Sequence, residues 1–192
     1  MKTQTLQVPG ASLYYEVRGA GPVLLMIPGG PMDADGFKDL ADRLSDDYTV
    51  VTYDCRGNSR SPMQGSWDDL TAGLFAGDAR RLLDAVGADQ ADVLGSSGGA
   101  TYALDLVARY PGRVRTLVAH EPPVSELLPD AARYHALNEL VGETYRSEGT
   151  FARRPARAVP RWPWRVRQPS RRVRRQGPRG SGGRPLVLSR FS

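Results

Sequence analysis

The chain has very few of the residues from which metal sites and disulfides are built. Its 192 residues include a single cysteine, Cys55, and two histidines. One cysteine excludes an internal disulfide and a cysteine-based zinc site. The two glycine clusters also lack the spacing of a dinucleotide-binding or phosphate-binding loop. We therefore expect neither a metal ion nor a cofactor.

Long apolar segments are missing as well. The longest apolar run, Val23–Ile27, is far too short to cross a bilayer. The first ten residues, MKTQTLQVPG, lack the apolar region of a secretory signal. These absences predict a cytoplasmic protein with no membrane partner, and they leave its oligomeric state open.

Acidic residues are absent from one part of the chain. Residues 151–192 contain 13 arginines, six prolines and no acid, whereas residues 1–150 hold 13 basic and 21 acidic residues. Frequent proline and sparse apolar side chains oppose both a long helix and a packed core. We predict a disordered basic tail at 150–192, and its abrupt change of composition favours a frameshift or truncation product. The alternative is a segment that binds nucleic acid non-specifically through its arginines, Trp162 and Trp164.

The rest of the sequence alternates between strand-like and helix-like apolar patterns. Strands are predicted at residues 3–8, 13–18, 23–27, 48–53, 92–94 and 114–119. Helices are predicted around residues 37–44, 69–86, 100–107 and 128–146. Strands that alternate with helices at this spacing pair in parallel through right-handed crossovers. We therefore predict an α/β protein with a mostly parallel sheet and helices on both faces.

A serine stands among glycines where the strand at 92–94 meets the next helix. The run Gly95-Ser96-Ser97-Gly98-Gly99 has the pattern G-x-S-x-G, which in this context predicts a strained turn with small neighbours around the serine. Such a turn raises the Ser97 hydroxyl at a helix N-terminus, where the helix dipole favours developing negative charge. Ser97 is the candidate nucleophile. The alternative is a tight turn whose serine caps a helix.

A second glycine loop, Pro28-Gly29-Gly30-Pro31, follows the strand at 23–27. An oxyanion hole needs two backbone N–H donors, one from the residue after the nucleophile and one from an earlier loop. Gly98 would supply the first donor. Gly30 is the best candidate for the second, because Pro31 has no N–H. The alternative is a simple turn at a strand end.

Four segments resemble α/β-hydrolases of the esterase, lactonase and cofactor-free haloperoxidase type: IPGGP, YDCRGNSRSP, DVLGSSGG and RVRTLVAHEPP. Their order and spacing make the resemblance specific over about residues 10–148. It implies a partial α/β-hydrolase domain at 1–149 that includes the start of a lid. It also implies a serine hydrolase acting on a small ester, lactone or similar acyl substrate. Many relatives have His-Gly where this chain has Pro28-Gly29, a change that leaves the backbone donors in place.

The YDCRGNSRS segment is expected to have a structural role. The resemblance implies that Asp54 accepts backbone N–H bonds and that Arg56 braces neighbouring loops. A catalytic Asp54 is the less favoured alternative. Cys55 has no histidine near it in the sequence and is expected to be an inert thiol.

The base and acid that a serine nucleophile needs are harder to find. In this fold they follow the serine as Asp or Glu and then His, and the resemblance implies that both would lie beyond residue 192. His120 and Glu121 end the strand at 114–119 and are one possible substitute, although a role in shaping the pocket floor is favoured. His135 is expected at the surface. We therefore predict an incomplete α/β-hydrolase fold that lacks its later strands and has little or no turnover, and a binding pseudo-enzyme or an inactive fragment is the alternative.

Overall fold

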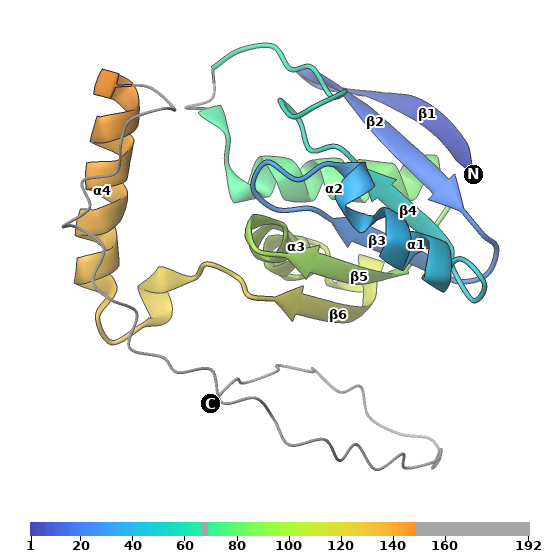
Figure 1. Cartoon of the computed structure of the whole chain (residues 1–192). Helices are drawn as coiled ribbons and strands as arrows, with labels where there is room; N and C mark the ends of the chain where they lie inside the picture. The colour runs from blue at the N-terminus through green and yellow to red at the C-terminus, as the bar shows by residue number, and fades with distance from the viewer. Residues whose placement is uncertain (67–68, 149–192) are drawn as a thin grey trace. The chain divides into compact units, whose positions relative to one another are not determined.

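A computed structural model describes residues 1–66 and 69–148 (Figure 1). The tail predicted at 150–192 lies outside these residues. The described chain divides into two units, Met1–Pro123 and the residues from Val124 onward. The second unit contains the short 3₁₀ helix η4 (Ser125–Leu127) and helix α4 (Ala131–Glu148), so a helix forms where one was predicted at 128–146.

The first unit contains a single six-stranded sheet and its covering helices. Its strands are β1 (Lys2–Val8), β2 (Ala11–Arg18), β3 (Val23–Ile27), β4 (Thr49–Tyr53), β5 (Ala91–Ser96) and β6 (Val114–His120). Its helices are η1 (Ala34–Phe37), α1 (Lys38–Leu44), α2 (Ala72–Ala85), α3 (Gly98–Arg109) and η3 (Pro111–Arg113). The strand order is β1-β2-β4-β3-β5-β6.

Parallel pairing dominates the sheet. β3 pairs in parallel with both β4 and β5, and β5 pairs in parallel with β6. β1 and β2 form an antiparallel hairpin that joins the sheet through β4. The loops that follow β3, β4 and β5 therefore leave the sheet at one edge, which is where parallel sheets place their binding residues.

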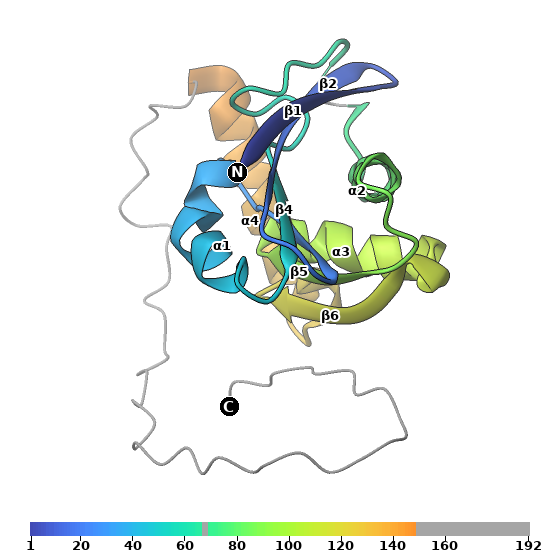
Figure 2. The same ribbon diagram turned by 90° about the vertical axis from the view of Figure 1, so that its right-hand side faces the viewer.

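Helices cover both faces of the sheet, as predicted. Figure 2 shows α1 on one side of the strands and α2 with α3 on the other. The alternation of side chains along β3 explains this arrangement. Leu24 and Met26 pack with Phe37 and Ala41 on the α1 side, whereas Leu25 and its neighbour Ile27 join the larger core under α2 and α3.

Two helices differ from prediction in which side chains they bury. In the segment at 37–44, Leu40 was expected in the core but is 42% exposed, because the buried face of α1 is centred on Ala41 and Leu40 lies at its edge. In α3 the buried large side chain is Leu106, while Leu104 and Val107 are only half-buried. The segment predicted as a helix at 69–86 forms α2 from Ala72, after the cap supplied by Thr71. No helix in the described residues is long and apolar enough to cross a membrane.

Candidate active site

Ser97 sits at a sharp turn between β5 and α3. Its φ of 53° and ψ of −122° lie in a region that residues with a side chain rarely adopt. The Ser97 N–H donates to the carbonyl of His120 at 2.8 Å, and the Ser97 carbonyl accepts from the Ala100 N–H at 2.9 Å. These bonds hold the turn between β6 and the start of the helix. The side chain of Ser97 itself is exposed.

Gly95 and Gly99 are the residues that allow this turn to form. A Cβ added to Gly95 would lie 2.5 Å from the carbonyl oxygen of Gly99. A Cβ added to Gly99 would lie 2.2 Å from the carbonyl oxygen of Ile27, at the end of β3. Real side chains do not approach backbone atoms so closely. Both glycines are thus required by contacts within the turn and across the sheet.

The Pro28-Gly29-Gly30-Pro31 loop packs directly against this turn. A Cβ on Gly29 would lie 2.8 Å from the Gly98 nitrogen and 2.9 Å from the Ser97 Cβ. A Cβ on Gly98 would lie 3.8 Å from the Gly30 nitrogen. Within residues 1–66 and 69–148, neither the Gly30 nor the Gly98 N–H is assigned a hydrogen-bond acceptor. The structure therefore brings together Ser97, Gly30 and Gly98, the three residues singled out from the sequence.

Asp54 lies at the end of β4 and is fully buried. Its Oδ1 accepts the Ala34 N–H at 2.9 Å, and its Oδ2 accepts the backbone N–H of Arg60 at 3.0 Å. The Arg60 guanidinium donates to both carboxylate oxygens. Burial raises the pKa of the Asp54 carboxyl, but the bonds from Arg60 and Ala34 outweigh this effect and hold the pKa below its ordinary value. This is the structural role that was expected.

Arg56 braces two distant segments, also as expected. Its Nε and one terminal nitrogen bond both oxygens of Asp78 in α2, at 2.7 and 2.6 Å. Its other terminal nitrogen donates to the carbonyl of Pro9, in the β1–β2 turn, at 3.2 Å. The Arg56 and Asp78 side chains are both buried, so Arg56 joins the turn after β4 to α2 and to the hairpin inside the fold.

Cys55 is only 8% exposed, and burial raises the pKa of its thiol to about 12. The thiol donates to the carbonyl of Pro28 at 3.8 Å. A thiol that stays protonated at neutral pH is a poor nucleophile. The expectation of an inert cysteine therefore agrees with its surroundings.

Within the described residues, neither histidine imidazole forms a hydrogen bond with the Ser97 hydroxyl. His120 pairs with Ser96 across β5 and β6, and its Nδ1 lies 3.4 Å from the Ser96 Oγ. Glu121 follows with a positive φ of 49° and an exposed side chain. His135 is exposed and bonds Glu126 within the second unit at 2.8 Å. The described residues thus place an imidazole beside Ser96 rather than beside the candidate nucleophile.

Two contacts were missed from the sequence because they join different loops. Asn58 donates to the carbonyl of Met32 at 2.9 Å, and Ser59 donates to the carboxylate of Asp33 at 3.0 Å. One sequence signal could have predicted these contacts: Asn58 and Ser59 directly follow a predicted strand, as the loop at 28–34 does. In the structure these two strands, β4 and β3, are parallel neighbours, so their following loops meet.

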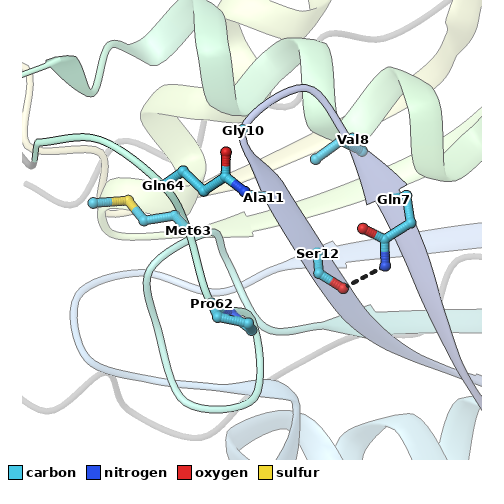
Figure 3. A pocket seen from close by; sticks show the side chains of 8 residues that line it. All are labelled: Gln7, Val8, Gly10, Ala11, Ser12, Pro62, Met63 and Gln64. Carbon is cyan, nitrogen blue, oxygen red and sulfur yellow. Dashed lines mark hydrogen bonds between the residues drawn. The ribbon is translucent and has the colours of Figure 1, made fainter.

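Other candidate binding features are sparse among the described residues. No group of three or more metal-binding side chains occurs within residues 1–66 and 69–148. A hollow of about 200 Å³ lies at the β1–β2 turn and is lined by Gln7, Val8, Gly10, Ala11, Ser12, Pro62, Met63 and Gln64 (Figure 3). None of these residues belongs to the Ser97 site.

Comparisons with known proteins identify the family to which this fold belongs. A family model described as alpha/beta hydrolase fold matches residues 22–156. The uncharacterized hydrolase YraK of Bacillus subtilis strain 168 is 46% identical over 124 residues, which are 65% of this chain and 46% of YraK. A zearalenone hydrolase of Cladophialophora bantiana is 33% identical over 128 residues, 65% of this chain and 48% of that protein.

A solved structure extends the comparison to three dimensions. The crystal structure of a hydrolase from Pseudomonas aeruginosa PA01 matches with a TM-score of 0.61 and 25% identity, over 75% of this chain and 56% of that one. The chain spans about half the length of the curated relatives it matches.

Proposed function

Because the chain belongs to the α/β-hydrolase fold family, we propose that it forms the nucleophile half of a serine hydrolase. Its substrate would be a small ester, lactone or similar acyl compound. The observation that carries this proposal is the meeting of Ser97, at its strained turn, with the backbone nitrogens of Gly30 and Gly98. A serine exposed between two free N–H groups is the arrangement that acyl transfer requires.

The proposed chemistry begins with attack of the Ser97 Oγ on the acyl carbonyl carbon. The carbonyl oxygen gains negative charge as the tetrahedral intermediate forms, and the Gly30 and Gly98 N–H groups would donate to it. The dipole of α3, which begins at Gly98, favours the same charge. Collapse of the intermediate expels the alcohol and leaves an acyl group on Ser97, which water then removes.

The described residues place no imidazole in hydrogen-bond contact with Ser97 to act as its base. A serine hydroxyl is activated by an imidazole within hydrogen-bond reach. Within residues 1–66 and 69–148, the only hydroxyl bonded by an imidazole is that of Ser96. We therefore propose slow acylation of Ser97 that requires activated esters, with little turnover, and we favour this over a binding pseudo-enzyme.

Acylation of the intact chain tests the proposal. The 192-residue chain would be treated with p-nitrophenyl acetate and, in parallel, with a fluorophosphonate, and the modified residue mapped by peptide mass spectrometry. We expect modification at Ser97 that Ser97→Ala abolishes. Ser96→Ala is the matched control, since it removes the neighbouring hydroxyl, and it should retain most of the reaction. Modification that persists in Ser97→Ala, or that maps to Ser96, would contradict the assignment.

The relative named as a zearalenone hydrolase suggests one natural substrate to examine. Zearalenone would be incubated with the full chain and its loss followed by chromatography. Any loss should disappear in Ser97→Ala. His120→Gln then asks whether His120 takes part in proton transfer, because this change should slow the reaction only if its imidazole is the base.

A further inference from the structure

The turn at residues 54–59 binds the loop at residues 28–34 at several points. Four side chains of this turn each contact a different residue of the loop. These contacts are Asp54 with the Ala34 N–H, Cys55 with the Pro28 carbonyl, Asn58 with the Met32 carbonyl and Ser59 with the Asp33 carboxylate. Together they fix the loop on both sides of Gly30.

Gly30 has open space on the side where a side chain would stand. Its backbone is exposed, and a Cβ built on it would meet nothing within 4 Å. Its φ of +56° is a left-handed conformation that glycine adopts freely. Because glycine is free in φ and ψ, the direction of the Gly30 N–H depends on how the residues on either side of it are held.

Those two sides are held differently. On one side, Gly29 is wedged against the Ser97 turn, where no side chain would fit. On the other side, the Met32 N–H donates to the Gly29 carbonyl at 3.2 Å and closes a turn around Gly30 and Pro31. The carbonyl of Met32 is then held by the amide of Asn58 at 2.9 Å. The Met32 side chain also packs against the core on the α1 side, and the Asn58 amide adds a hydrogen bond that fixes the Met32 carbonyl at this end of the turn.

The amide of Asn58 is a rigid anchor because its own backbone is fixed. The Asn58 N–H donates to the Cys55 carbonyl at 2.9 Å, and the Asn58 carbonyl accepts from the Ser61 N–H at 2.9 Å. The Gly57 N–H donates to the Ser61 carbonyl at 2.7 Å. These bonds form a compact turn directly after β4, next to β3, from which the 28–34 loop leaves.

We infer that Asn58 is a positioning residue for the oxyanion hole: its amide holds the Met32 carbonyl and thereby aims the Gly30 N–H at the oxygen of the acyl group on Ser97. This inference rests on the proposed function. Preorganised donors act because they need not reorient as charge develops. A small misplacement of such a donor slows the reaction with little effect on substrate binding.

The test compares Asn58→Ala and Asn58→Asp with the wild-type full chain. Alanine removes the donor, and aspartate keeps the size of the side chain but places a carboxylate against the Met32 carbonyl. We expect the maximal rate of Ser97 acylation by p-nitrophenyl acetate to fall about tenfold in both variants, with the half-saturating ester concentration within about twofold of wild type. Gln7→Ala is the control, because the Gln7 side-chain amide donates to the Ser12 hydroxyl, outside the site.

Backbone amide exchange supplies a second readout that needs no activity. Peptides that cover residues 29–32 should exchange faster in both Asn58 variants than in wild type or Gln7→Ala, while peptides from β3 and β5 keep their protection. Unchanged exchange in this turn would overturn the inference. Faster exchange with an unchanged acylation rate would overturn it as well, since the turn would then be loose without consequence.

The two readouts separate failure of the inference from failure of the proposed function. If wild type is not acylated at Ser97, the proposed function fails, and the inference that Asn58 aims a catalytic donor fails with it. Amide exchange then still reports whether Asn58 holds the turn. If wild type is acylated and both variants match it, only the inference fails.

Discussion

The centre of the sheet and its β6 margin hold their side chains very differently. Val93 in β5 lies between two parallel neighbours and is 1% exposed. Val118 in β6 is 47% exposed, and within the described residues β6 pairs only with β5. The candidate site residues are also divided between the centre and the margin. Ser97 and the glycine loop belong to the centre, whereas His120 and Glu121 belong to the margin.

The difference in packing matters for the proposed site, because some of its groups come from backbone and others must come from side chains. The turn at Ser97 and the proposed oxyanion donors at Gly30 and Gly98 are formed by backbone, and the close packing of β3 against the start of α3 holds them together. A base and its acid must come from side chains aimed at Ser97. The margin aims the His120 imidazole at Ser96 instead, because register pairs these two residues on one face.

The largest loss of stability is expected from a side chain at the packed centre. Gly99→Ala places a methyl group 2.2 Å from the Ile27 carbonyl oxygen and 2.6 Å from that of Pro28. We expect this change to lower the free energy of unfolding by about 3 kcal/mol or more, measured by urea denaturation. Gly112→Ala is the control, because its methyl group would meet nothing within 4 Å. Equal stability of the two variants would show that the contact between β3 and α3 is not tight.

Matched truncations compare the centre and the margin directly. Val93→Ala should lower the free energy of unfolding by about 2 kcal/mol, because it leaves a cavity in the core. Val118→Ala removes the same atoms from a half-exposed position and should lower it by less than about 0.5 kcal/mol. Denaturation of both variants under one set of conditions gives the comparison. A large effect at Val118 would mean that another surface covers β6.

Acid should weaken the centre through Asp54. The pKa of its carboxyl is lowered in the folded protein, so its contribution to stability is present above the ordinary aspartate pKa of about 3.9. That contribution is lost as the pH falls through the folded-state value. We expect the difference in unfolding free energy between wild type and Asp54→Asn to be constant above about pH 5 and to narrow below about pH 4. A difference that widens in acid would contradict the direction of the shift.

Thiol reactivity compares solvent access at the centre and at the margin, and it requires the smallest change in stability of these experiments. With the pKa of Cys55 raised to about 12, its reaction with a disulfide reagent at about pH 8 should be slower than in the denatured chain by a factor on the order of 1,000. Val118→Cys, made in a Cys55→Ser background, should react readily while folded. Rapid reaction of Cys55 in the folded protein would show that the packing around Cys55, next to the Pro28 carbonyl, opens.

Much of the fold could be predicted from the sequence because its signals are local. The run VLLMI indicates a strand buried on both faces, and β3 is that strand. The glycines around Ser97 predict a strained turn, because only residues without side chains fit beside it, and the φ of Ser97 agrees. The face of a short helix is harder to predict. Leu40 lies at the edge of the face that Ala41 buries, and apolar spacing alone does not show which of two adjacent residues points to the core.

The sequence by itself determined the turn at Ser97, the buried strands and the division of charge between residues 1–150 and 151–192. Each of these follows from steric limits or composition within a few neighbouring residues. Only the tertiary structure decided that Asn58 anchors the Met32 carbonyl and that His120 bonds Ser96. These contacts join residues 24 and 26 positions apart. They depend on the strand order β4-β3-β5-β6 and on register, which are settled only when the whole sheet assembles.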